Sequence, residues 1–146
     1  MKHLPPRCLF AAALMFAASG LAQAAEPTPE HAAACVAALE SEAEILAEQF
    51  RQGKVETEPE LVQRVQEGFA FIGSVYKQGV RDAEANKLLK AAEKAQEELP
   101  PAELAARQAA CQAEGARLLE RANFIERAFV NGKAHRRVDK LKQARP

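Results

Sequence analysis

Residues 101–131 of this chain read PAELAARQAACQAEGARLLERANFIERAFVN. Apolar residues recur in this stretch at steps of three, four and seven, which places them on one face of a long α-helix. The members of this stripe are Leu104, Cys111, Leu118, Ala122, Ile125 and Phe129. The pattern predicts one helix over 101–131, and a weaker apolar stripe among basic residues extends the prediction to 143.

Cys111 lies on this stripe, and Cys35 lies on the apolar face of an earlier predicted helix. Residues 1–24, which contain the third cysteine, Cys8, have the composition of a signal peptide. In an exported chain the other two cysteines favour a disulfide, because the compartment is oxidising. The spacing offers no C-x-x-C pair for redox chemistry or zinc. We predict a Cys35–Cys111 disulfide that closes 76 residues of chain. Whether the bond forms within one chain or between two is left open by the sequence.

Residues 1–24 have the composition of a cleavable signal peptide. Lys2 and Arg7 make the start basic, residues 8–18 form a short apolar core, and a small-x-small site ends at Ala24. The apolar core is too short for a permanent transmembrane helix. We therefore expect cleavage near Ala24 and a periplasmic or secreted protein.

The remaining residues, 25–146, have the length of a single domain. The signal removes two basic residues and no acids, which leaves 18 Lys/Arg against 20 Asp/Glu, a net charge of −2. This balance argues against a nucleic-acid partner. Residues 26–48 carry six acids and no Lys or Arg, whereas 131–146 carry six Lys or Arg residues and one acid. We expect these segments to attract each other; the alternative is that the basic segment 132–146 contacts an anionic membrane surface.

Helix boundaries are signalled clearly elsewhere. Thr28 before Pro29 predicts one helix start, and the spacing of Thr57 and Glu60 predicts a capping box at another. The predicted helices before residue 101 cover 28–52, 57–78 and 82–98. The core-facing stripe of the second is Val62, Val65, Phe69, Ile72 and Tyr76. Since no stretch alternates with the period of a strand, we predict an all-α bundle of three to four helices.

The segment 57–98 allows either one long helix or two helices with a break at Gly79. A single helix hairpinned against 101–142 would separate Cys35 from Cys111 by roughly 20 Å along the bundle. A disulfide needs Cα atoms within about 7 Å. The broken version, in an up-down-up-down bundle, brings the cysteines level and is favoured. Its corollary is that residues beyond Leu118 overhang, with a swung-out basic helix or a dimer through it.

Residues 69–95 resemble one Sel1/tetratricopeptide-type repeat. The similarity consists of the Gly73–Tyr76–Gly79 spacing, the acidic residue that follows, Ala85, and an Ala-Ala-Glu near the end. The resemblance implies a helix-turn-helix with close helix contact at Gly73 and Ala85, a turn at Gly79, and protein binding. It covers about 30 residues in one copy, and a single copy builds no solenoid.

The residue inventory argues against an enzyme. After cleavage the histidines are His31 and His135, near opposite ends of the chain, and serine and threonine total four. A Ser/His/Asp catalytic arrangement is therefore not expected, because few serines and histidines are present and the histidines are far apart in the sequence. Glu114 and Arg117 are interpreted as an ordinary i,i+3 surface pair. We expect no catalytic residue, no cofactor and no metal site.

Two functions from different classes remain. The first is a non-catalytic periplasmic interaction or scaffold protein that binds another envelope protein or a second copy of itself. Its candidate partner surface is Phe124, Phe129, Arg136 and Arg137, because Phe71 and Phe124 fall off the main stripes and the C-terminal segment overhangs. The second is a helical carrier or chaperone-like binder that takes apolar ligands or unfolded chains between its helices.

Overall fold

A computed structural model describes residues 25–144, which form five α-helices and no strand. The predicted signal peptide lies outside the described residues. The helices are α1 (Pro29–Arg51), α2 (Glu58–Lys77), α3 (Asp82–Glu97), α4 (Pro101–Arg121) and α5 (Phe124–Gln143), with a single 3₁₀ turn at Val55–Thr57 before α2. The all-α prediction is confirmed, and the predicted number of helices is one or two too low.

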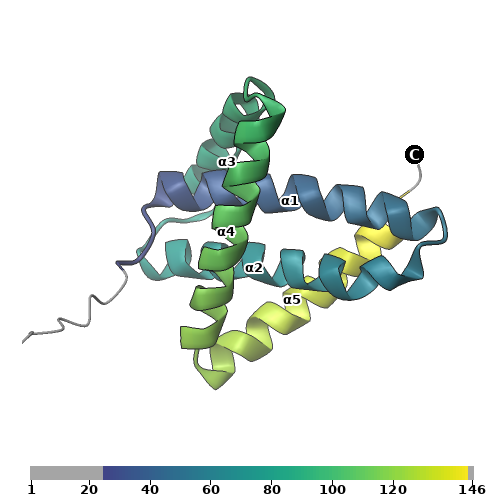
Figure 1. Cartoon of the computed structure of the whole chain (residues 1–146). Coiled ribbons are helices and arrows are strands. Elements are labelled where there is room, and N and C mark those ends of the chain that lie inside the picture. The colour runs from purple at the N-terminus through teal and green to yellow at the C-terminus, as the bar shows by residue number, and fades with distance from the viewer. Residues whose placement is uncertain (1–24, 145–146) are drawn as a thin grey trace, which may run out of the picture.

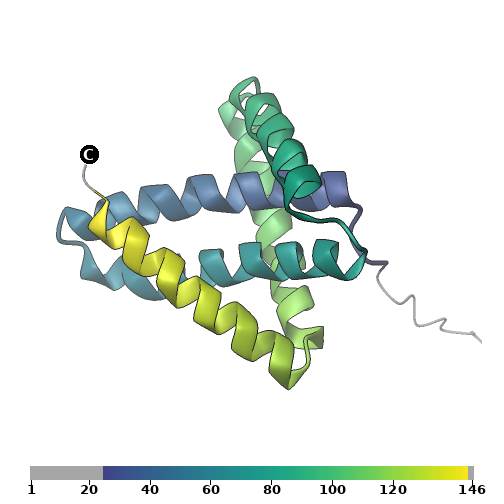
Figure 2. The same cartoon turned by 180° about the vertical axis from the view of Figure 1, so that it is seen from behind.

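The α1–α2 hairpin is the middle of the molecule. The two helices run antiparallel and reverse at Gly53, whose φ of 97° suits glycine. Helix α4 crosses both helices on one face (Figure 1), while α3 packs on α1 and α5 packs on α2 at the opposite face (Figure 2). The expected up-down-up-down bundle is therefore wrong, because α4 runs across the hairpin instead of alongside it.

The break at Gly79 is confirmed. Gly79 has φ 91°, a left-handed conformation that ends α2, and α3 begins at Asp82. Asp82 is the first helical residue; the cap position itself is Arg81, which makes no side-chain capping bond. The close contact implied at Gly73 is absent, since a Cβ there would meet nothing within 4 Å.

The single helix predicted over 101–131 is wrong. α4 ends at Arg121, Ala122 is extended, and Asn123 starts α5 with a capping box in which its side chain accepts from the Glu126 amide. The Glu126 carboxylate in turn accepts from the Asn123 amide. This Asn-x-x-Glu signal is visible in the sequence, but the apolar stripe that runs through it hides the boundary.

The expected swung-out basic helix is also wrong, because α5 folds back onto the hairpin. Its buried residues are Val130, Ala134, Val138 and Leu141. The last three join a core cluster with Leu46 of α1 and with Leu61 and Val65 of α2. Arg137 pairs with Glu40, and Lys142 pairs with Glu58 at 2.5 Å. The Arg137–Glu40 pair joins the basic segment to the acidic segment 26–48, as predicted, whereas Glu58 lies outside that acidic segment.

Helix α2 is buried on more than one face, which the sequence stripe does not convey. Phe71, which the stripe excludes, is fully buried, whereas Tyr76, which the stripe includes, is exposed. The reason is position: α1, α4 and α5 all pack on α2. A helix with neighbours on three sides has no single core-facing stripe.

The Cys35–Cys111 pair is confirmed within one chain. The two sulfurs lie at bonding distance, with Cα atoms 5.2 Å apart, and both residues are buried. The bond joins α1 to α4 where the two helices cross. The break at Gly79 and the crossing of α4 together make this possible.

Gly115 sets how closely α4 approaches α2. A Cβ at this position would lie 2.8 Å from Cβ of Glu67 and 3.3 Å from its Cα. We expect Gly115→Ala to lower the free energy of unfolding by about 1–3 kcal/mol, because two buried helices must separate. Urea unfolding followed by circular dichroism measures this.

Gly68→Ala is the matched control, because a Cβ at Gly68 of α2 would meet nothing within 4 Å. There the better helix propensity of alanine should stabilise by up to about 1 kcal/mol. If Gly115→Ala were as stable as Gly68→Ala, the close approach of α4 to α2 would be contradicted.

Candidate functional site

The corner between α4 and α5 exposes three large apolar side chains. The exposed fractions are 85% for Phe124, 77% for Ile125 and 53% for Phe129. Ile125 and Phe129 are four residues apart and therefore share one face of α5. The corner projects at the bottom of the molecule in Figure 1, away from the α1–α2 hairpin. A single exposed apolar residue is ordinary, but three at one corner form a patch.

Basic side chains continue the same face of α5. Lys133 and Arg136 follow Phe129 at four and seven residues, and both are exposed. The ammonium of Lys133 lies 5.3 Å from the centre of the Phe129 ring. We call Phe124, Ile125, Phe129, Lys133 and Arg136 the corner surface. The corner surface faces away from the buried residues of α5. This helix therefore has a buried apolar face and an exposed face that is partly apolar and partly basic.

The carboxylate nearest in sequence to the corner surface, that of Glu126, already has a cationic partner. Glu126 pairs with Lys77 of α2 at 2.6 Å. The Lys77 bond, followed by the hydrogen bond from the Asn123 amide, holds the pKa of Glu126 below its usual value. Glu126 is therefore committed to holding α5 on α2, and the corner surface keeps a positive character.

The residues of the predicted partner surface do not stay together. Phe124, Phe129 and Arg136 lie on the corner surface. Arg137 instead pairs with Glu40 and is half-buried, so it belongs to the docking of α5. The predicted partner surface omits Ile125 and Lys133, although each lies four residues from Phe129 and therefore on the same helix face.

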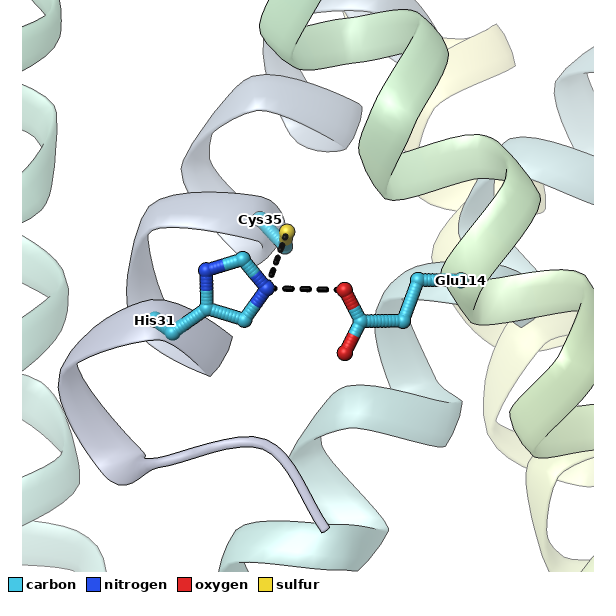
Figure 3. A group of neighbouring side chains, drawn as sticks. All are labelled: His31, Cys35 and Glu114. Atoms are coloured by element: carbon cyan, nitrogen blue, oxygen red, sulfur yellow. Dashed lines mark hydrogen bonds and ion pairs between the residues drawn. The ribbon is translucent and has the colours of Figure 1, made fainter. Parts of the chain in front are cut away.

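A second group of polar residues lies beside the disulfide. Nε2 of His31 on α1 is 2.8 Å from a carboxylate oxygen of Glu114 on α4 and 3.8 Å from Sγ of Cys35 (Figure 3). The expected pairing of Glu114 with Arg117 gives way to this contact between helices. The sequence could not reveal it, since His31 and Glu114 are 83 residues apart.

A small apolar pocket opens between α1, α2 and α3. Its volume is about 180 Å³, and apolar side chains form most of its wall. They are Ala32, Ala33, Val36, Ile72, Val75, Leu88 and Leu89. Typical small-molecule sites have about 300–1,000 Å³. The pocket therefore has room for a short apolar group and not for a large ligand.

A buried ionic network lies where α1, α2 and α4 meet. Arg64 bonds Glu67 at 3.0 Å and Glu42 at 2.9 Å, and Gln112 of α4 also donates to Glu42. Burial raises the pKa of Glu67, although Arg64 and a bond from Gln63 act in the opposite direction. A carboxyl with a raised pKa is a candidate acid or base. Here only 1% of Glu67 is exposed, so no substrate reaches it and the network holds the helices together.

Comparison of the chain with protein-family models, curated proteins and solved structures finds no match. Within residues 25–144, no helix is both long enough and apolar enough to cross a bilayer.

Proposed function

We propose that this protein is a non-catalytic interaction protein of the cell envelope, exported after cleavage near Ala24. Its working surface is the corner surface on α5, and its partner is an acidic, amphipathic segment of another envelope protein. The observation that carries the proposal is the exposure of Phe124, Ile125 and Phe129 at one corner, next to Lys133 and Arg136. Apolar anchors with charged neighbours are the usual composition of a protein interface.

The apolar part of the corner surface supplies the affinity. Burying one large apolar side chain contributes roughly 1.5–3 kcal/mol. Association itself has an entropic cost that offsets part of this gain. Three such side chains therefore suit a transient complex better than a permanent one. The corner is also built on a helix that α2 holds firmly, which leaves little ordering to be done on binding.

The basic part of the corner surface selects the partner. Lys133 and Arg136 have no carboxylate partner among the ion pairs that the described residues form; Arg136 donates instead to the backbone oxygen of Gly132 at 3.1 Å. A partner with carboxylates beside its apolar residues complements this arrangement. Such charge complementarity acts mainly on specificity and association rate, and it weakens as salt is added.

A second candidate function is carriage of a small apolar ligand. The pocket between α1, α2 and α3 favours it, and Tyr76, Asp82 and Asn86 at its edge offer polar groups that could orient a ligand. The volume of about 180 Å³ limits the ligand to a short apolar group. Native mass spectrometry of the purified protein tests it: a bound small molecule supports carriage, and a bare chain opposes it.

The corner surface is tested first by photo-crosslinking. A photoreactive residue at position 125 should form a crosslink to one acidic partner in the envelope. The same residue at position 45 is the control, because Ile45 is also exposed, at 56%, but lies on α1. Crosslinks of equal yield and identity from both positions, or crosslinks to lipid alone, would contradict the proposal.

The purified pair then allows binding measurements. We expect Ile125→Glu with Phe129→Glu to weaken binding by about 100-fold or more, because two buried apolar anchors are lost. Arg136→Ala should weaken binding several-fold and reduce its salt dependence. Arg137→Ala is the matched control, since Arg137 pairs with Glu40 and should leave the affinity unchanged. Equal effects of the two arginine variants would exclude the corner surface as the binding site.

A further inference from the structure

The residues around the disulfide are arranged as two pairs on two crossing helices. His31 and Cys35 are four residues apart on α1, and Cys111 and Glu114 are three residues apart on α4. Residues at these spacings share one helix face. The two faces meet at the disulfide, where the side chains of His31, Cys35 and Glu114 gather (Figure 3) and Cys111 is bonded to Cys35.

Three of the four residues already lie at distances close to those in a metal site. The nitrogen of His31, the sulfur of Cys35 and an oxygen of Glu114 lie within 4.8 Å of one another. Zinc bonds of about 2.0–2.3 Å in a tetrahedron place neighbouring ligand atoms about 3.3–3.8 Å apart. The observed contacts of 2.8 Å and 3.8 Å from His31 Nε2 bracket that range.

The orientation of the histidine ring is held by its surroundings. The ring packs edge-on against Phe71, with the ring centres 6.4 Å apart. In this orientation Nε2 points toward the sulfur and the carboxylate, as Figure 3 shows. Half of the His31 side chain is exposed, at 51%, so the group is reachable from solvent although both cysteines are buried.

We propose that the reduced form of this protein binds one zinc-type divalent cation through His31, Cys35, Cys111 and Glu114. In the oxidised form the two sulfurs are bonded to each other and are poor ligands, because the thiolate is the form that binds zinc. A dithiol reductant passes two electrons and two protons to the disulfide and becomes a disulfide itself. The cation then displaces both thiol protons, and the His31 and Glu114 side chains complete a four-ligand set.

The metal and the disulfide therefore exclude each other at one position. Either one ties α1 to α4 at the same crossing. A chain that meets zinc before an oxidant would hold the same helix crossing through the metal. The metal site is separate from the proposed partner surface, which lies at the α4–α5 corner and includes none of these four residues.

A cobalt titration tests the proposal. The protein is reduced with a phosphine, desalted without oxygen and titrated with Co²⁺, which reports thiolate ligation through a sulfur-to-cobalt charge-transfer absorption. We expect this absorption to saturate at one Co²⁺ per reduced chain, to disappear when Zn²⁺ is added, and to be absent from the oxidised protein. Circular dichroism recorded alongside shows whether the reduced chain is folded before or only after the metal binds.

Variants distinguish a four-ligand site from two free thiols. His31→Ala and Glu114→Gln should each weaken Co²⁺ binding by at least about tenfold, because even residues behind the ligands of a metal site cost 10–100-fold in affinity. His135→Ala is the control and should bind as the unmodified chain does, since His135 lies on α5. The proposal is overturned if the reduced protein gives no charge-transfer absorption, or if His31→Ala and Glu114→Gln bind Co²⁺ as tightly as His135→Ala.

Discussion

Replacing Cys35 and Cys111 together by alanine is expected to lower the free energy of unfolding by about 4–5 kcal/mol, because the disulfide closes a loop with a sequence separation of 76 residues. In the chain-entropy description, a closed loop of this length removes many conformations from the unfolded chain. Domains of this size have about 5–15 kcal/mol in total. The disulfide thus accounts for a large part of the stability.

The loss of stability on removing the disulfide should be largest in α4. Helix α4 buries only Cys111, Gly115 and Leu118, because it crosses the hairpin instead of lying along it. With so small a buried area, α4 depends on the disulfide more than α2 does, which packs on three helices. Hydrogen exchange should therefore accelerate most in α4, while the α1–α2 hairpin keeps more of its protection.

Urea unfolding of the double variant, with and without a reductant, measures the loss. The reductant should destabilise the unmodified protein and leave the variant unchanged, which serves as the internal control. A difference in stability below about 1 kcal/mol would contradict the prediction. It would mean that the tie between α1 and α4 adds little to contacts already present.

The second large effect is expected at Arg64. Arg64→Met should lower the free energy of unfolding by about 3–5 kcal/mol at neutral pH, because it leaves a buried carboxylate without its cation. Glu67 is the residue left behind: its side chain is 1% exposed, and its remaining polar contact is with Gln63 at 2.9 Å. Methionine fills a similar volume, so the change tests charge more than packing.

The loss at Arg64 should depend on pH in a defined direction. Burial raises the pKa of Glu67 above the ordinary value of 4.5, and removal of Arg64 takes away an opposing influence, so the pKa rises further. A group with a raised native pKa contributes most below its unfolded pKa and loses that contribution as the pH rises through the native pKa. Arg64→Met should therefore destabilise less at pH 4 than at pH 7.

Arg137→Met is the matched control for charge removal. Arg137 also pairs with a glutamate between helices, but 38% of its side chain is exposed and 34% of the Glu40 side chain. Pairs that solvent reaches contribute about 0–1 kcal/mol. Equal losses for the two variants, or a loss at Arg64 that grows as the pH falls, would contradict the assignment of Glu67 as the stranded charge.

Local signals in the sequence were sufficient for most helix boundaries. Thr28 with Pro29 starts α1, and Gly79 ends α2 as expected, since caps and turn glycines act through their own backbone. The boundary at Asn123 carried a signal of the same kind. It was overridden by an apolar stripe that continues across the break, because periodicity cannot tell one helix from two in the same phase.

The corner surface was predictable in part. The sequence points to Phe124 and Phe129 because they lie in a segment expected to extend past the bundle, and both are exposed. The expectation was right about exposure and wrong about its cause, because α5 is docked and not swung out. Arg137 was misassigned, since the sequence does not show which of two adjacent arginines faces Glu40.

By itself, the sequence determined the all-α class, and it favoured the pairing of Cys35 with Cys111 and the break at Gly79. These follow from helix periodicity, from the two cysteines outside the predicted signal peptide, and from the short reach of a disulfide. The tertiary structure decided that α4 crosses the hairpin, that Glu67 is buried against Gly115, and that His31 meets Glu114. These depend on the angle at which helices cross, which side-chain packing between distant segments sets.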